Sequence, residues 1–353
     1  MLRVEWNALS TAAVEAFLRR LPSQKIGVLG DLFLDRYFDL DATLTEPSIE
    51  TGLDAYQVVR VRSYPGAAGT VVNNLSALGV GSIFPIALIG DDGEGHEVRQ
   101  ALAALHGVSL EGVESWAGRR TPTYLKPMLV EPGRSPRELN RLDIHNRQRM
   151  SKDAEDRLIQ LLEQRSSQLD ALVVLDQVSE PDCGMITERV RDHLADFARR
   201  NHGVLILADS RERIGSFRNV AVKPNHHELR RAIPGLSVED GVRQLYHRIG
   251  NSVFCTCGAR GILLATPDLE VMEVPGYPVS GPVDPVGAGD STSAGIAAAW
   301  AAGASPWQAA AFGNLVASIT VQQLGTTGTA TPEQVRARWR EVETKRAGSV
   351  SDG

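Results

Sequence analysis

The chain has 353 residues, of which 42% are hydrophobic and 23% are charged, an ordinary composition for a globular protein. Its length allows one large domain, alone or with a small one. The formal net charge of −6 argues against a nucleic-acid partner, which requires a basic surface. No sequence run approaches the roughly 20 apolar residues that span a bilayer, and three cysteines make no disulfide framework, so we expect a cytoplasmic protein without a membrane partner.

Short apolar runs alternate with helical patterns along most of the chain. After an N-terminal helix that contains Val14, Phe17, Leu18 and Leu21, the predicted strands are Lys25–Leu29, Ile83–Ile89, Ala171–Leu175, Val204–Ala208, Val220–Lys223, Ser252–Thr256 and Ile262–Ala265. Further helices are predicted from near Ser151, over Cys183–Asn201, after Asn225, over Ala288–Ala302 and over Trp307–Gln323. This alternation predicts an α/β domain of three layers, with a central, mostly parallel sheet between helices.

Two stretches break the alternation. In 38–63 and 121–141, valine and tyrosine alternate with arginine, so each predicted strand has an apolar and a solvated face. We expect the two stretches to form a small β-sheet lid over a substrate cleft. Residues 1–37, 64–120 and 142–340 then form the large domain, and 341–353 are expected to be a frayed polar tail.

The segment Gly281–Gly295, with the sequence GPVDPVGAGDSTSAG, carries the strongest chemical signal. Gly287, Ala288 and Gly289 precede an Ala-rich helix. Glycines let the backbone approach a ligand closely, and a helix N-terminus adds the positive end of its dipole, so we predict an anion hole for phosphate oxygens. Asp290 follows in the first turn, where a carboxylate either caps the helix or takes a proton from an attacking hydroxyl.

The arrangement D-x-x-G-A-G-D from Asp284 to Asp290 resembles the signature of the ribokinase-like (pfkB) carbohydrate kinases, and the resemblance extends over about Lys25 to Pro332. It implies the ribokinase-like fold and a transfer of phosphate from ATP, with Mg²⁺, to a sugar hydroxyl. The resemblance also implies that Asp290 is the catalytic base and that Gly287, Ala288 and Gly289 supply the anion hole.

Two further segments resemble those that bind the acceptor substrate in this family. The segment GDLFLD, from Gly30 to Asp35, is similar to the strand end whose acidic residues hold substrate hydroxyls. Tyr64–Gly79 resembles a glycine-rich turn that runs into a helix, although relatives usually have two adjacent glycines where this chain has glycine followed by alanine. A bare turn with a helix cap is the alternative. The implied substrate contacts are Asp31, Asp35, Gly66, Ala67 and Asn73, with Asn74 as the alternative to Asn73.

Three segments resemble the nucleotide side. Asn225–Glu228 is similar to the family's N-x-x-E element, which organises Mg²⁺ through the oxygen ligands that this ion prefers; a helix-capping role is the alternative for Glu228. The implied nucleotide contacts are Asn225, Thr256, Gly258, Gly261, Asp284 and Asn314, and the implied metal ligands are Asn225 and Glu228. In many relatives the loop around the anion hole and a loop like Gly325–Gly328 also bind a monovalent cation such as K⁺.

The acceptor is indicated by GDLFLDRY near the start, by Thr121–Thr123 and by Asn140–Asp143, which together are most similar to the heptose-phosphate kinase branch. An acceptor that already carries a phosphate needs cationic side chains near that phosphate, away from the hydroxyl that reacts. The lid segments supply Arg60, Arg62, Lys126 and Arg141, unless these form only a solvated face. Of these we expect Lys126 and Arg141 to bind substrate.

The resemblance also implies a homodimer through the lid, where Val58, Val59 and Val61 supply apolar surface. Two alternative functions stay open. One is a ribose or nucleoside kinase of the same family, and the other is a non-catalytic sugar- or nucleotide-binding regulator on the same fold. The unbroken Gly287–Asp290 segment argues against the regulator, because a protein that has lost catalysis is expected to lose its base first.

Overall fold

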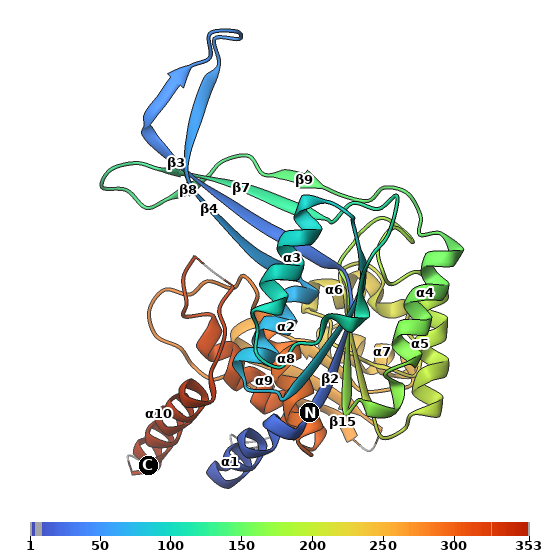
Figure 1. Cartoon of the computed structure of the whole chain (residues 1–353). Helices are drawn as coiled ribbons and strands as arrows, with labels where there is room; N and C mark the ends of the chain where they lie inside the picture. Colours follow the sequence, from blue (N-terminus) through green and yellow to red (C-terminus); the bar gives the residue numbers. More distant parts are fainter. Residues whose placement is uncertain (1, 4–8, 268, 326, 352–353) are drawn as a thin grey trace.

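A ten-stranded sheet forms the centre of the large domain (Figure 1) in the computed structural model, which describes residues 2–3, 9–267, 269–325 and 327–351. In spatial order its strands are β1 (Leu2–Arg3), β15 (Leu269–Pro275), β14 (Gly261–Thr266), β13 (Val253–Thr256), β12 (Ala221–Val222), β11 (Leu205–Ser210), β10 (Ala171–Asp176), β2 (Lys25–Gly30), β5 (Ser82–Ile89) and β6 (Val113–Ser115). Neighbouring strands are parallel except for the pairs β13–β14 and β14–β15. The mostly parallel sheet is therefore confirmed.

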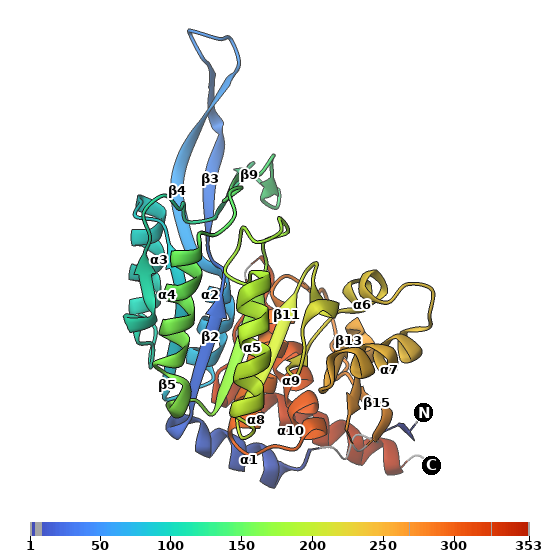
Figure 2. The ribbon, with the colours of Figure 1, turned by 90° about the vertical axis from the view of Figure 1, so that its right-hand side faces the viewer.

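Helices cover both faces of this sheet, which confirms the three layers (Figure 2). One layer contains α2 (Ala68–Ala77), α8 (Ala288–Ala301) and α9 (Pro306–Thr320), and the other contains α4 (Lys152–Glu163), α5 (Glu188–Arg200), α6 (His226–Ala232) and α7 (Val238–Ile249). Strands β10 and β11 are buried along their whole length between the layers, as continuous apolar runs predict. The remaining helices are α1 (Thr11–Arg20), α3 (Gly93–Ala103) and α10 (Pro332–Ser351), with short 3₁₀ turns at Leu21–Ser23, Leu110–Gly112, Ser166–Gln168, Ile214–Ser216 and Gly258–Arg260.

Two of the predicted helix boundaries are wrong. Helix α5 begins at Glu188 rather than near Cys183, because the hydroxyl of Thr187 caps it by accepting a hydrogen bond from the backbone N–H of Val190 at 3.3 Å. The expected frayed tail is helical, since α10 continues to Ser351. Val335, Trp339 and Val342 recur at helical spacing and are buried against the domain, which anchors the helix that runs into the polar segment.

A smaller sheet projects from the large domain (Figure 1). Its strands are β4 (Asp54–Ala67), β3 (Leu32–Pro47), β7 (Thr123–Val130) and β8 (Arg137–Glu138), and β9 (Leu142–Ile144) pairs with β7. Strands β3 and β4 form a long antiparallel hairpin, while β3 and β7 run parallel. The small sheet extends beyond the predicted lid segments, because β3 starts directly after Asp31, β4 runs to Ala67 and β9 follows residue 141.

Within the part of the chain that the structure describes, no helix is both long enough and apolar enough to cross a bilayer.

Candidate active site

The predicted site residues gather where the large sheet meets the small one. Strands β2, β10, β11, β12 and β13 are mutually parallel, so their carboxyl ends lie at one edge of the sheet, where α/β folds place their ligands. Asp31, Ser210, Lys223 and Thr256 lie at these ends. Helix α8 begins at the same edge, since Asp209 near the end of β11 and Lys223 after β12 both act electrostatically on its Asp290.

The predicted anion hole opens α8. Gly287 is the N-cap residue with φ 77° and ψ 0°, a left-handed conformation that favours glycine, and a Cβ there would lie 3.3 Å from the side chain of Thr327. The first N–H groups of a helix have no partner within the helix and can therefore bind an anion. A Cβ on Gly289 would lie 3.6 Å from Nζ of Lys223, so an ammonium group lies directly beside this first turn.

Asp290 is partly buried in the first turn of α8. Desolvation and the negative charge of Asp209 raise its pKa from 3.8 to about 7, while Lys223 and Arg211 act in the opposite direction. Asp35, at the base of the small sheet, also raises this pKa, so the two predicted functional carboxylates lie in one site. A carboxyl group with a pKa near the working pH is suited to accept a proton from a substrate hydroxyl.

A buried ion pair between Lys223 and Asp209, which was not predicted from the sequence, lies beside the first turn of α8. Nζ of Lys223 is 2.8 Å from Oδ2 of Asp209, and the two residues are 2% and 6% exposed. Burial alone would lower the pKa of Lys223, but the attraction of Asp209 outweighs it and the pKa is raised. The available signal was positional, because Asp209 directly follows the predicted strand run VLILA and Lys223 ends the predicted run VAVK.

The predicted metal element forms a reciprocal cap on α6. Oδ1 of Asn225 accepts hydrogen bonds from the backbone N–H groups of His227 and Glu228, both at 2.9 Å. Oε2 of Glu228 accepts one from the N–H of Asn225 at 2.7 Å. Burial and the charge of Asp209 raise the pKa of Glu228. The cap uses one of the two carboxylate oxygens of Glu228.

Asn225 and Glu228 offer the oxygen ligands that Mg²⁺ prefers, near the predicted anion hole. Among the described residues no group of three or more His, Cys, Asp or Glu side chains could hold a metal by itself. Mg²⁺ keeps several waters and is usually bound through one or two carboxylates together with substrate phosphates, so such a cage is not required.

The predicted nucleotide contacts also order the surrounding loops. Asn225 and Thr256 form a parallel bridge, which brings two of the predicted segments together. A Cβ on Gly261 would lie 2.3 Å from the carbonyl oxygen of Val274, so only glycine fits there, and Gly258 has φ 59°. The side-chain amide of Asn314 donates to that same carbonyl of Val274 at 3.0 Å and so holds the end of β15.

Asp284 joins the loop of the anion hole to the loop after α9. Its Oδ1 accepts from the N–H of Val286 and its Oδ2 from the N–H of Gly325, both at 3.0 Å. These are the two loops that the family resemblance links with a monovalent cation. Residue 326 of the second loop lies outside the described residues.

On the acceptor side, Asp35 lies at the base of the small sheet with its carboxylate 3.1 Å from Nζ of Lys126. That Nζ also donates to the hydroxyl of Tyr37 at 3.1 Å. A Cβ on Gly66 would lie 2.7 Å from Oδ2 of Asp35, so the predicted turn glycine leaves space for this carboxylate. A small pocket beside it is lined by Asp35, Tyr37, Tyr64, Gly325 and Thr327.

The turn between β4 and α2 contains an alanine in an unfavourable conformation. Ala67 has φ 53° and ψ −116°, a combination that suits glycine. Of the two asparagines that follow, Asn73 is half-buried and Asn74 is completely buried, with its amide donating to the carbonyl of Thr70 at 2.9 Å. Asn73 is therefore better placed than Asn74 to contact a ligand.

We expect the Ala67→Gly substitution to stabilise the protein by about 1 kcal/mol, because glycine adopts this φ without strain. The matched control is Ala68→Gly. Ala68 is the first residue of α2, where glycine is expected to lower the stability slightly. Thermal and denaturant unfolding of both variants measure the difference. An unchanged or lowered stability of Ala67→Gly would show that the turn is not strained.

Three of the four predicted lid cations, Lys126, Arg62 and Arg141, are already paired with acids of the same sheet, while Arg60 is exposed. Lys126 pairs with Asp35, and the guanidinium groups of Arg62 and Arg141 lie 2.7 Å and 2.6 Å from carboxylates. These carboxylates belong to Asp39 and Asp143, respectively.

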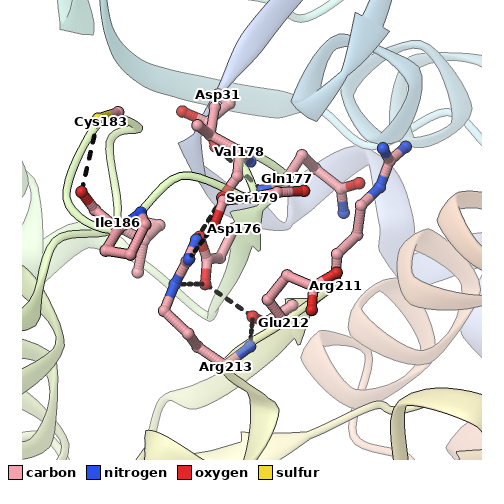
Figure 3. A network of polar contacts seen from close by, with 12 residues as sticks. Asp31, Asp176, Gln177, Val178, Ser179, Cys183, Ile186, Arg211, Glu212 and Arg213 are labelled. Carbon is pink, nitrogen blue, oxygen red and sulfur yellow. Dashed lines mark hydrogen bonds and ion pairs between the residues drawn. The ribbon is translucent and has the colours of Figure 1, made fainter. Parts of the chain in front are cut away.

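Arg211, which the sequence analysis did not select, follows β11 and is exposed. Its guanidinium points away from the neighbouring Asp176–Arg213 pair (Figure 3), and it forms no hydrogen bond or ion pair in the part of the chain that the structure describes. Among the described residues, Arg211 is therefore an unpaired cation that acts on Asp290.

Asp31 lies apart from the open side of the site. It is 2% exposed, and its two oxygens accept hydrogen bonds from the backbone N–H groups of Gln177, Val178 and Met185. These contacts favour a role in holding the backbone over the predicted contact with a substrate hydroxyl.

The chain is similar to known proteins over most of its length. The family described as pfkB family carbohydrate kinase matches residues 38–334. The chain is 28% identical over 337 residues to the bifunctional protein HldE of Citrifermentans bemidjiense, covering 92% of this chain and 65% of that protein. It is 27% identical over 335 residues to the bifunctional protein HldE of Trichlorobacter lovleyi, covering 92% and 64%. The chain thus spans about 65% of the length of these curated relatives.

Solved structures share the fold at lower identity. Phosphofructokinase-2 from Escherichia coli in complex with potassium has a TM-score of 0.66 and 20% identity, covering 91% of this chain and 99% of that chain. Ribokinase from Arabidopsis thaliana, complexed with ribose and ATP, has a TM-score of 0.64 and 18% identity, covering 89% and 98%. A ribokinase-like fold is therefore confirmed.

Proposed function

Because the chain belongs to the pfkB family of carbohydrate kinases, it is a phosphotransferase with an alcohol group as acceptor, and we propose that it transfers the γ-phosphate of ATP to a hydroxyl of a sugar or sugar phosphate. The observation that carries the proposal is the carboxyl group of Asp290, with a pKa of about 7, in the first turn of α8 beside the ammonium group of Lys223. This combines a base for the hydroxyl with positive charge for the phosphoryl group.

In the proposed reaction Asp290 accepts the hydroxyl proton while the hydroxyl oxygen bonds to the γ-phosphorus. The bond from that phosphorus to the bridging oxygen breaks, and ADP leaves. The N–H groups of Gly287 and Gly289 and the ammonium of Lys223 stabilise the charge on the transferring oxygens, whereas the predicted donor Ala288 gives its N–H to the carbonyl of Pro285 at 3.1 Å. Asp35 and the turn at Gly66 hold the acceptor. Closure of the small sheet excludes water, which limits ATP hydrolysis.

The nucleotide is proposed to lie along Asn225, Thr256 and the turn at Gly258–Gly261, near Asn314 and Asp284. Bound Mg²⁺ would neutralise phosphate charge, and Asn225 with Glu228 would hold it and its waters. The pairing of Asn225 with Thr256 supports this placement, because it aligns the metal element with the phosphate turn. The two loops joined by Asp284 are the proposed place for a monovalent cation such as K⁺.

The finer proposal for the acceptor is a sugar phosphate, with a heptose 7-phosphate as the first candidate. It is supported by the similarity to proteins named HldE and by the free guanidinium of Arg211 near Asp290. The lid cations Lys126 and Arg141 support it less, because each already has a carboxylate partner.

We expect Arg211→Gln to raise KM for a sugar-phosphate acceptor by about 10- to 100-fold, the loss of one or more hydrogen bonds to a charged group, with little change in KM for ATP. Arg19→Gln is the matched control, since Arg19 is an exposed arginine on α1, outside the predicted site. Initial rates with each substrate varied in turn measure the effect. A rise in KM for ATP alone would assign Arg211 to the nucleotide.

The first test of the function is ADP release from ATP and Mg²⁺ across sugars, sugar phosphates and nucleosides. Turnover restricted to phosphorylated heptoses or hexoses is expected. Turnover with a neutral sugar or nucleoside would support the ribose or nucleoside kinase alternative. ATP binding without turnover of any acceptor would favour the non-catalytic regulator.

The proposed partner of the small sheet is a second copy of the chain. The β3–β4 hairpin leaves apolar side chains exposed, among them Leu44, Leu53, Val58, Val59 and Val61. Sedimentation equilibrium is expected to give a dimer for the native chain and a monomer for Val59→Glu, because burial of an unpaired charge opposes association. The control is Glu46→Gln on β3, which removes a charge instead of adding one. A native monomer at all concentrations would remove the proposal.

A further inference from the structure

Asp31 holds one loop through three backbone hydrogen bonds. Its Oδ1 accepts from the N–H of Met185 at 2.7 Å, and its Oδ2 accepts from Gln177 at 3.0 Å and Val178 at 3.3 Å. All three donors belong to residues 177–187, which connect β10 with α5. A Cβ on Gly184 would lie 2.8 Å and 3.0 Å from the two carboxylate oxygens, so the loop is shaped closely around this side chain.

The start of the same loop is held from its other side by Arg213 (Figure 3). The guanidinium of Arg213 binds the fully buried carboxylate of Asp176 through two nitrogens, at 3.1 Å and 2.6 Å. It also donates to the carbonyl of Ser179 at 2.9 Å and to that of Val178. The hydroxyl of Ser210 donates to Asp176 at 2.6 Å. Charge-assisted bonds on both sides therefore fix residues 177–179.

The fixed loop in turn contacts strands of the small sheet. Val178 and Cys183 form a small apolar cluster with Phe33 of β3, against which Tyr124 of β7 packs. The rings of Phe33 and Tyr124 lie 5.2 Å apart between centroids.

Two further contacts come from segments that flank strands of the small sheet. Arg119, which precedes β7, donates to the carbonyl of Cys183 at 2.8 Å. The N–H of Met150, which follows β9, donates to the carbonyl of Asp182 at 2.8 Å. The loop thus joins the large sheet to β3 and to the segments around β7 and β9.

We propose that Asp31 is a positioning residue, whose carboxylate fixes residues 177–187 as the seat for the small sheet and so sets the position of Asp35 relative to Asp290. This rests on the proposed function, because it assigns to the small sheet the task of covering the acceptor. If residues 177–187 were less well ordered, the small sheet would no longer hold the acceptor in one position, and water could enter the site. The expected consequences are weaker acceptor binding and ADP release without sugar phosphorylation.

The test compares the full-length native chain with Asp31→Asn at pH 8, where Asp31 is ionised because its pKa is about 6. The amide keeps the size of the side chain but replaces one acceptor oxygen with a donor, so it cannot keep all three bonds. We expect acceptor KM to rise at least tenfold, ADP release per sugar phosphorylated to rise several-fold, and KM for ATP to stay unchanged. Hydrogen exchange should accelerate in residues 177–187 and also in β7 and β9.

Asp170→Asn is the matched control. Asp170 also accepts a backbone hydrogen bond, from the N–H of Lys25 at 2.8 Å, but it does so at the opposite end of the same strands. This variant is expected to leave acceptor KM and the coupling ratio unchanged. If Asp31→Asn does not fold, Gly184→Ala replaces it, because the added methyl group displaces the carboxylate without removing it.

Two outcomes would overturn the proposal. Faster exchange confined to residues 177–187, with unchanged acceptor KM and coupling, would make Asp31 a local structural residue only. A higher acceptor KM with unchanged exchange and coupling would make it a direct substrate contact. If no acceptor is turned over at all, the proposed function fails, and the exchange measurement still decides whether the loop seats the small sheet.

Discussion

The Asp290→Asn variant is expected to fold, to bind ATP and to lose catalysis by about 10³- to 10⁴-fold in kcat, because the amide cannot accept the proton of the acceptor hydroxyl. Asp153→Asn is the matched control, since Asp153 also lies in the first turn of a helix, α4, and is exposed. Steady-state kinetics measure the loss of catalysis, and titration with ATP measures nucleotide binding separately. A kcat within tenfold of the native value would reduce Asp290 to a helix-capping role.

The pH dependence of the native protein and of Asp290→Asn gives an independent check on the role of Asp290 as the base. Because the base must be ionised and its pKa is about 7, native kcat is expected to rise about tenfold per pH unit below pH 7 and to level off above it. The stability should follow the opposite trend. A carboxyl whose pKa is raised by folding costs stability as pH rises from about 4 through 7, so Asp290→Asn is expected to melt higher than the native protein at pH 8 and alike at pH 4.

The Lys223→Met variant is expected to lose about 3–5 kcal/mol of stability, because it leaves the buried carboxylate of Asp209 without its 2.8 Å partner. It should also lose most of its turnover, since the ammonium group beside the first turn of α8 is gone. The double variant Lys223→Met with Asp209→Asn removes both charges and is expected to regain most of the stability but none of the activity. Urea unfolding and kinetics distinguish the two effects, and a fully active double variant would exclude Lys223 from catalysis.

The parts of the site that were predicted are contiguous in the sequence. Gly287, Ala288 and Gly289 are followed directly by Asp290, so one short segment indicates a phosphate-binding turn, a helix start and a base. Asn225 and Glu228 likewise lie one helical turn apart, and the sequence predicts their proximity whether they cap α6 or hold a metal. Local spacing determines such geometry before any tertiary contact forms.

The parts that were missed depend on which strands become neighbours. The pairing of Asp209 with Lys223 requires that β11 and β12 lie side by side in parallel, which no local pattern states. The pairing of Arg62 with Asp39 requires the register of the β3–β4 hairpin, in which Asp39 pairs with Arg60. Acidic residues that follow a strand look alike in sequence, so Asp31 and Asp35 were both interpreted as substrate contacts. In the structure, Asp31 accepts hydrogen bonds from the backbone, whereas Asp35 lines a pocket.

Strand β3 has a mechanical consequence. It is a single strand of 16 residues that begins at the large sheet and ends near the tip of the hairpin, paired with β4 on one side and β7 on the other over its first half. Only Leu34–Asp41 is paired on both sides, and the pairing with β4 is irregular between Asp41 and Glu46. The doubly paired part bends little, so it acts as a lever arm of roughly 27 Å, and a rotation of about 5° at its base would move Asp41 by roughly 2 Å. Occupancy of the acceptor site should therefore be detectable along the hairpin, away from the bound molecule.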